Sequence, residues 1–137
     1  MGEVFRSESV MMTEEYGMHL ASELHGGTVL ALFGGMGMGK TALVRGIAAG
    51  LGLSAEVSSP TFALVHDYGG HPPLVHFDMY RVTGWEDLYS TGFFDYLDAG
   101  AILVIEWSEN IVSALPDDAI CLNFSRIDEN TRLIERE

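Results

Sequence analysis

Residues 34–41, with the sequence GGMGMGKT, constrain the fold of this 137-residue chain more than any other segment. They fit the pattern of a phosphate-binding loop, which is glycine, four variable positions, glycine, lysine, then serine or threonine. Glycines in such a loop expose backbone N–H groups to phosphate oxygens, and the helix that follows adds the positive end of its dipole. Lys40, the only lysine of the chain, is expected to meet the β- and γ-phosphates of a nucleotide, and the Thr41 hydroxyl to face a magnesium ion.

The segments on either side are those that such a loop requires. Residues 28–33 form an apolar, partly β-branched run that predicts a strand, and Leu43, Ile47 and Leu51 recur on one face of a helix predicted to end at Gly52. The alternative is a flexible glycine turn with an ordinary surface lysine, and the order of strand, loop and helix disfavours it. We therefore predict nucleotide contacts from seven residues: Gly34, Gly37, Met38, Gly39, Lys40, Thr41 and Ala42.

Two acidic residues at predicted strand ends complete this site. A phosphate loop needs carboxylates that hold magnesium and orient the attacking water. Asp78 ends the strand-like run 74–77, and Glu106 ends the continuous apolar run 101–105. In an open α/β sheet, ligands gather at the carboxyl ends of the strands, so both residues are candidate catalytic and metal-binding groups. The alternative is that each carboxylate only marks the exit of a strand into solvent.

The remaining pattern indicates one α/β domain over residues 1–137. We expect a three-layer sandwich in which a mixed sheet of the P-loop NTPase type has helices on both faces. A first helix is predicted at residues 13–25, with Thr13 as its cap. The other predicted elements are a hairpin of residues 63–68 and 74–79, helical turns at 85–89 and 93–97, a helix at 108–115, and a hairpin of residues 120–126 and 131–136.

The charge of the chain limits its partners. Seven basic against twenty acidic side chains give a net charge of −13. Such a surface repels nucleic-acid backbones, which proteins hold with lysine and arginine, and it favours basic partners. No apolar run is long enough to span a bilayer, and the N-terminus lacks the features of a secretory signal. We therefore expect a cytoplasmic location and no membrane partner.

The nucleotide is expected to be ATP. Guanine-specific GTPases carry an Asn-Lys-x-Asp element, which is impossible in a chain whose single lysine is Lys40. Three functions stay open from the residues alone: an ATPase that couples hydrolysis to a protein complex, a small-molecule kinase, and a nucleotide-dependent interaction module without useful turnover. Kinases of this type usually need a lid with several arginines, and the six arginines of this chain are not clustered.

Other polar residues carry weaker signals. A loop with Ser58, Ser59 and Thr61 could fold over the γ-phosphate or be an ordinary polar loop. Arg81 could meet developing charge, although an ordinary ion pair is the simpler interpretation. The histidines, His76 among them, do not show metal-ligand spacing, so core or surface roles are expected.

Five segments in a fixed order also carry a family resemblance. They are residues 34–41 followed by Leu43-Val44-Arg45-Gly46; Ser58-Ser59-Pro60-Thr61-Phe62 with Leu64-Val65-His66; His76-Phe77-Asp78-Met79-Tyr80-Arg81; Glu86-Asp87-Leu88; and Ile105-Glu106-Trp107. With these segments the chain resembles, over nearly its whole length, the TsaE (YjeE) family of small bacterial ATPases. That family is needed for the threonylcarbamoyl modification of the tRNA adenosine beside the anticodon.

The resemblance implies a role for each candidate residue. It places Lys40 and residues 37–41 on the phosphates of ATP, Thr41 and Glu106 on Mg²⁺, and Asp78 on the metal or its water. It also implies partner proteins, the threonylcarbamoyl transferase subunit and its paralogous companion, whose cycling depends on ATP hydrolysis. Since the surface is acidic, a protein partner is expected, with no strong direct tRNA binding by the chain alone.

Overall fold

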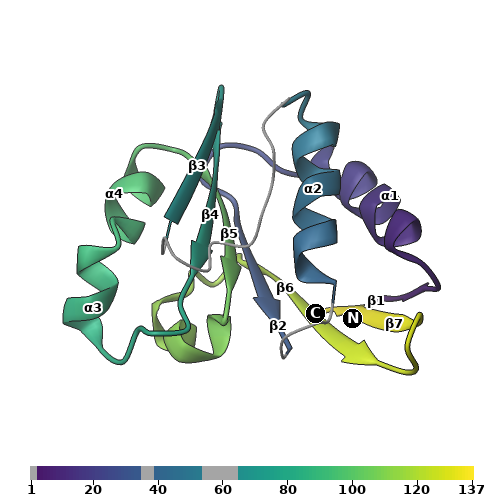
Figure 1. Ribbon diagram of the computed structural model, residues 1–137. Coiled ribbons are helices and arrows are strands. Elements are labelled where there is room, and N and C mark those ends of the chain that lie inside the picture. Colours follow the sequence, from purple (N-terminus) through teal and green to yellow (C-terminus); the bar gives the residue numbers. More distant parts are fainter. Residues whose placement is uncertain (1–2, 35–38, 54–64) are drawn as a thin grey trace.

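A sheet of seven strands in the spatial order β1-β7-β6-β2-β5-β4-β3 organises the fold (Figure 1). The computed structural model describes residues 3–34, 39–53 and 65–137. The strands are β1 (Glu3–Ser7), β2 (Val29–Phe33), β3 (Val65–Gly70), β4 (Pro73–Asp78), β5 (Ile102–Glu106), β6 (Ile120–Arg126) and β7 (Arg132–Arg136). The helices are α1 (Val10–Ala21), α2 (Lys40–Gly50), α3 (Trp85–Ser90), α4 (Phe93–Asp98) and the 3₁₀ helix η1 (Ser108–Ala114).

The four central strands of this sheet run parallel. β2 pairs in parallel with β5 and β6, and β5 pairs in parallel with β4. Every residue of β5 and all but the last residue of β2 are buried, which explains the continuous apolar runs in the sequence. The outer strands β3, β7 and β1 each pair antiparallel with their inner neighbour. The mixed sheet predicted from the sequence is therefore confirmed.

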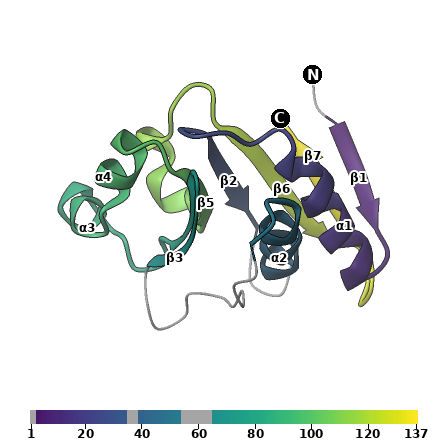
Figure 2. The ribbon, with the colours of Figure 1, turned by 90° about the horizontal axis from the view of Figure 1, so that it is seen from above.

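Helices cover both faces of the sheet, as predicted (Figures 1 and 2). α1 and α2 lie on one face, where Leu43 packs with strand residues such as Leu30 and Val104. α3, α4 and η1 lie on the other face, where the rings of Phe93 and Phe77 meet edge to face with centroids 5.8 Å apart. Across the described residues, no helix combines the length and the apolar character needed to cross a membrane.

Two glycines allow α1 and α2 to pack closely. A Cβ atom at Gly46 would overlap the carbonyl oxygen of Glu14, and one at Gly17 would overlap that of Leu43. The backbones of the two helices therefore lie in direct contact. This contact fixes α2, whose first residue is Lys40.

The N-terminal region differs from the prediction. α1 begins at Val10 and is capped by Ser9, whose Oγ accepts a hydrogen bond from the Met12 N–H at 3.1 Å, so the prediction of Thr13 as the cap is wrong. Thr13 is buried within the helix, and its hydroxyl lies 2.6 Å from that of Ser7. The sequence pattern also misses β1 and extends the helix past its end at Ala21.

The other predicted elements lie close to their expected positions. The hairpins are β3–β4 and β6–β7, and the two helical turns are α3 and α4. The helix predicted at 108–115 is the 3₁₀ helix η1, in which the backbone of Ile111 departs from helical angles.

Candidate functional site

The carboxyl ends of β2, β4 and β5 lie at one edge of the sheet, because the three strands are parallel. The phosphate-loop segment follows β2, Asp78 ends β4 and Glu106 ends β5. Asp78 and Glu106 are direct partners in the register of these two strands. The structure therefore brings together the two acids that the sequence places at strand ends.

The two acids also share a face of the sheet with Lys40. Leu74 of β4 and Val104 of β5 belong to the core cluster beneath α1 and α2. Strand residues separated by an even number of positions share a face, so Asp78 and Glu106 lie on the α2 side as well. Because α2 begins at Lys40, the predicted cation and the predicted carboxylates converge on one corner of the molecule.

The described part of the phosphate loop uses glycines where other residues would be strained. Gly34 has a φ of 124° and Gly39 a φ of 90°. The Gly34 N–H donates a 3.0 Å hydrogen bond to Oε2 of Glu109 in η1, which anchors the start of the loop. Gly39 provides no side-chain cap for α2, and the N–H groups in the first turn of a helix are donors of the kind that bind anions. Gly37 and Met38, two of the predicted nucleotide contacts, lie outside the described residues.

The Lys40 side chain reaches back to Gly34, the first residue of the loop. Its Nζ donates a 2.6 Å hydrogen bond to the Gly34 carbonyl oxygen and lies 5.4 Å from the centroid of the Trp107 ring. Only 4% of Lys40 is exposed, and Thr41 and Ala42 follow it in the first turn of α2. A phosphate oxygen is a stronger partner for an ammonium than a neutral carbonyl, so an incoming phosphate can replace Gly34.

His76 holds the carboxylate of Glu106. Nε2 of His76 lies 2.6 Å from Oε2 of Glu106, with His76 fully buried (0% exposed) and Glu106 7% exposed. On the other side of the ring, Nδ1 of His76 lies 3.4 Å from the hydroxyl of Tyr68, which lies 3.1 Å from Nδ1 of His66. A chain of polar side chains therefore runs from Glu106 to β3. Such partners fix the orientation of a buried carboxylate.

This contact is the part of the site that the sequence interpretation misses. Core or surface roles were expected for the histidines, and His76 is buried in the core, but its pairing with Glu106 was not predicted. One signal was available, since His76 stands two residues before Asp78 and must share its face of the strand.

The residue after Glu106 forms a wall of the site. Trp107 is the one non-glycine residue with a positive φ, 59°, in the part of the chain that the structure describes. This backbone conformation costs about 1 to 2 kcal/mol and is typical of functional sites. The Trp107 ring packs on Tyr80 with centroids 4.9 Å apart and lies near the Lys40 ammonium. Trp107 therefore covers the buried cation.

The Asp78 carboxyl titrates above its ordinary range. Burial raises its pKa, and although the Tyr80 N–H at 2.8 Å from Oδ1 lowers it, the neighbouring Glu106 carboxylate raises it further. A carboxylate with a raised pKa is a better proton acceptor than an exposed aspartate.

Asp78→Asn is expected to stabilise the metal-free protein slightly at neutral pH, and the gain is small because solvent screens this partly buried carboxyl. Because folding raises the pKa of Asp78, the fold favours the protonated form, and stability falls as the pH rises through the folded pKa. Asparagine keeps an acceptor for the Tyr80 N–H and removes the charge. Thermal unfolding in EDTA at several pH values measures the effect. The gain should vanish below the ordinary pKa of aspartate, and a gain that does not change with pH would contradict this explanation.

The oxygen donors at this corner fit magnesium. Thr41, Asp78 and Glu106 offer one hydroxyl and two carboxylates, which are hard ligands of the kind that Mg²⁺ prefers. Within residues 3–34, 39–53 and 65–137, no group of three or more His, Cys, Asp or Glu side chains could hold a metal by itself. Mg²⁺ usually combines one or two carboxylates with substrate phosphates and water.

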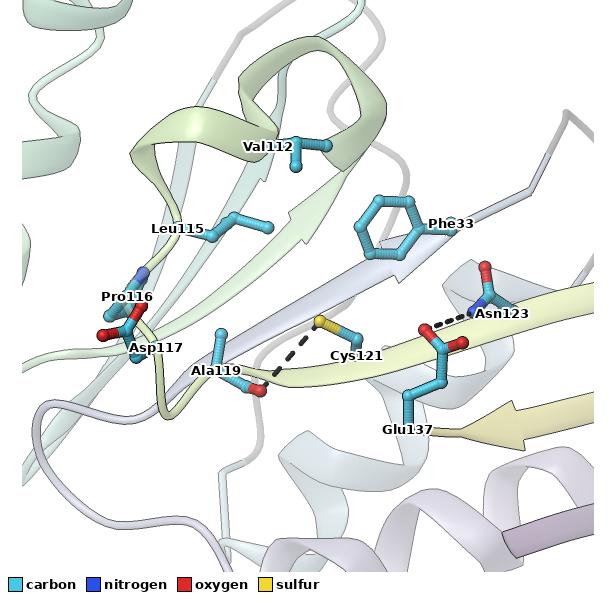
Figure 3. A pocket seen from close by; sticks show the side chains of 9 residues that line it. All are labelled: Phe33, Val112, Leu115, Pro116, Asp117, Ala119, Cys121, Asn123 and Glu137. Atoms are coloured by element: carbon cyan, nitrogen blue, oxygen red, sulfur yellow. Dashed lines mark hydrogen bonds between the residues drawn. The ribbon is translucent and has the colours of Figure 1, made fainter. Parts of the chain in front are cut away.

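A separate pocket of about 340 Å³ lies between η1 and the β2–β6 face of the sheet (Figure 3). Its lining includes none of the predicted site residues: Phe33, Val112, Leu115, Pro116, Asp117, Ala119, Cys121, Asn123 and Glu137. Burial, with the nearby Glu137 carboxylate, raises the pKa of the Cys121 thiol, so the thiol stays neutral.

Comparisons with known proteins agree with the geometry. The family model described as "Threonylcarbamoyl adenosine biosynthesis protein TsaE" matches residues 7–134. A tRNA threonylcarbamoyladenosine biosynthesis protein TsaE from Treponema pallidum is 34% identical over 93% of this chain and 95% of its own length. The protein of the same name from Streptomyces coelicolor is 40% identical over 82% of this chain and 78% of its own length.

A solved structure gives the same result for the fold. The crystal structure of YdiB from Bacillus subtilis superposes with a TM-score of 0.83 at 27% sequence identity, and the match covers 99% of this chain and 84% of that one. The family match spans nearly the whole chain and includes every candidate site residue. This chain belongs to the TsaE family of threonylcarbamoyl adenosine biosynthesis proteins.

Proposed function

We propose that this chain is a magnesium-dependent P-loop ATPase that acts in the threonylcarbamoyl modification of the tRNA adenosine beside the anticodon. It acts through the threonylcarbamoyl transferase subunit and its paralogous companion. The observation that carries the proposal is the convergence of Lys40, Asp78 and Glu106 at one corner of the sheet. The names of the relatives from Treponema pallidum and Streptomyces coelicolor support the tRNA modification.

Each residue has a distinct proposed role. Lys40 exchanges the Gly34 carbonyl for oxygens of the β- and γ-phosphates, which the N–H groups of the first turn of α2 also bind. Thr41 and Glu106 hold magnesium, which when bound offsets the negative charge of the phosphates. Asp78, with its raised pKa, orients the attacking water and accepts its proton. His76 contacts neither the nucleotide nor the metal in this proposal, and its role is to keep Glu106 in place.

Two other functions use the same loop and differ in what becomes of the bound ATP. A small-molecule kinase would transfer the γ-phosphoryl group to an acceptor, and an interaction module would bind ATP without turnover. The deciding experiment measures phosphate release from ATP by the purified chain, alone and with the transferase subunit and its companion. Release that rises with these partners supports the proposal. ATP binding without release, even with the partners present, would favour the interaction module.

His76→Leu is expected to weaken magnesium-dependent nucleotide binding by about 10- to 100-fold, the usual effect of removing a group that orients a metal ligand. Leucine fills the buried position and leaves Glu106 without its 2.6 Å partner. ATP binding measured in EDTA should change little, since His76 does not line the phosphate loop. His76→Gln, whose amide can take the place of Nε2, should recover most of the magnesium dependence. Equal losses for the leucine and glutamine variants would contradict a positioning role.

The isolated chain is expected to bind tRNA weakly or not at all. Lysine and arginine supply most non-specific affinity for nucleic acids, and this chain has seven such residues against twenty acidic ones. A filter-binding titration at moderate salt, with the chain alone and then with its partners, measures this. Tight tRNA binding by the chain alone would move the tRNA contact onto this subunit.

A further inference from the structure

Two exposed aromatic side chains, Trp85 and Tyr89, pack around the half-buried Phe94 on α3 and α4, away from the nucleotide corner. Trp85 is 53% exposed and Tyr89 is 64% exposed. Trp85 stacks on Phe94 with ring centroids 6.2 Å apart, and Tyr89 meets Phe94 at 4.9 Å. We call Trp85, Tyr89 and Phe94 the α3–α4 patch. Large aromatic groups that remain in solvent beside each other are typical of protein interfaces, where they become the central anchors.

The patch is additional to the core contacts of these helices. Leu88 of α3 and Phe93 of α4 are buried against the sheet and hold the two helices in place. Phe94 also packs against this core, whereas Trp85 and Tyr89 lie outside it and are each more than half exposed. Burying their exposed surface against another molecule would therefore be favourable.

The surface around the patch is acidic. Four exposed carboxylates belong to the same two helices: Glu86, Asp87, Asp95 and Asp98. The sequence has no lysine, arginine or histidine from Val82 to Ser125, and the ion pairs found in the described residues do not involve these four acids. Asp87 accepts hydrogen bonds from the Thr83 side chain and backbone, which lower its pKa and keep it ionised.

We propose that this protein docks on its partner protein through the α3–α4 patch. The patch would bind an apolar pocket on the partner that is bordered by lysine and arginine. This inference rests on the proposed function, in which the partner is the threonylcarbamoyl transferase subunit with its companion. The acidic border repels nucleic acids and anionic lipids, and it repels a second copy of a chain with a net charge of −13. A basic protein surface is the occupant whose charge complements it.

The position of the patch allows docking while the nucleotide site is occupied. α3 and α4 form one end of the molecule, beyond β3 and β4, and α2 covers the other face of the sheet (Figure 1). The connection from Asp78 to α3 is short and is anchored by the buried side chains of Met79 and Val82. Only residues 79–84 would therefore separate a partner bound at α3 from Asp78 along the chain.

Binding to the purified transferase–companion complex tests this surface. Trp85→Ala and Tyr89→Ala should each weaken binding to the complex by about 10-fold or more, as expected for aromatic anchors. Met11→Ala is the matched control, since Met11 is exposed on α1, outside the patch. The ATP affinity of the isolated variants should equal that of the native chain.

A second pair of variants keeps the aromatic cluster intact, in case its loss loosens α3. The double variant Glu86→Lys with Asp95→Lys should slow association with the complex and reverse its salt dependence. Glu8→Lys with Glu15→Lys makes the same change of charge on exposed sites outside the patch and should have a smaller effect.

The outcomes separate this inference from the proposed function. If the native chain binds the complex and all patch variants bind equally well, the docking surface is wrong and the proposed function stands. If the native chain does not bind the complex, the partner in the proposed function is wrong, and the docking surface fails with it. Self-association of the native chain that Trp85→Ala abolishes would assign the patch to a second copy and overturn the inference.

Discussion

Lys40→Ala is expected to lower ATP turnover by about 100-fold or more, the usual cost of removing a buried group that stabilises charge in a transition state. The reason is the position of the ammonium. Lys40 is buried at the start of α2, and its Nζ has the Gly34 carbonyl oxygen as its hydrogen-bond acceptor. The chain has no other lysine that could substitute for it. ATP affinity should fall as well, because the ammonium meets the phosphates in the bound ground state too.

Calorimetry on the folded variant measures the loss of affinity, and phosphate release measures the loss of turnover. Arg45→Ala is the matched control, because it removes one cation from the same helix. Arg45 is an exposed residue whose partner is Glu14 at 3.1 Å, a surface pair worth at most about 1 kcal/mol. A folded Lys40→Ala protein with native ATP affinity would contradict the phosphate-loop assignment.

The single lysine also permits a direct test of contact. Reductive methylation with ¹³C-formaldehyde modifies only Lys40 and the N-terminal amine of this chain. Saturating ATP is expected to slow the methylation of Lys40 and to leave the N-terminal amine unchanged, which serves as an internal control. Equal rates for Lys40 with and without ATP would mean that the ammonium does not meet the phosphates.

The elements that the sequence predicts well are those whose environment determines their composition. β2 and β5 are buried on both faces, so only continuous apolar runs fit there, and these runs are visible without a structure. The short helices α3 and α4 could be separated because Gly92 between them adopts a φ of 83°.

The elements that the sequence misses depend on distant partners. β1 is a strand because it pairs with β7 from the opposite end of the chain, and its five residues carry too short a pattern to show this. The start of α1 was misplaced because Val10 and Met11 are exposed apolar residues that do not follow the apolar face of the helix. Ser9 then caps the helix one turn before Thr13.

The same distinction holds for the site. Lys40 belongs to a local motif, so the sequence alone is enough to predict its role. The contacts of His76 with Glu106 and of Glu109 with Gly34 arise from the register of β4 on β5 and from the path of η1, neither of which a linear pattern contains. Predicting them requires the strand order before any side chain is considered.

Glu106→Gln is expected to reduce magnesium-dependent hydrolysis by roughly 100-fold while metal-free ATP binding stays close to native. The substitution keeps the shape of the side chain and a hydrogen-bonding group for His76, so the strand end should keep its structure. It removes the negative charge that would face the magnesium. Because Glu106 is buried beside Asp78, its charge acts through little intervening water and has a large effect.

Glu109→Gln is the control for this variant. Glu109 is also a carboxylate at the wall of the site, but its Oε2 accepts the Gly34 N–H, a bond that a glutamine oxygen can keep. Turnover of Glu109→Gln should therefore remain near native over a range of magnesium concentrations, while Glu106→Gln should need far more magnesium for any turnover. If Glu106→Gln lost ATP affinity equally in EDTA and in magnesium, the carboxylate would support the loop instead of the metal, and the assignment of Glu106 as a magnesium ligand would be wrong.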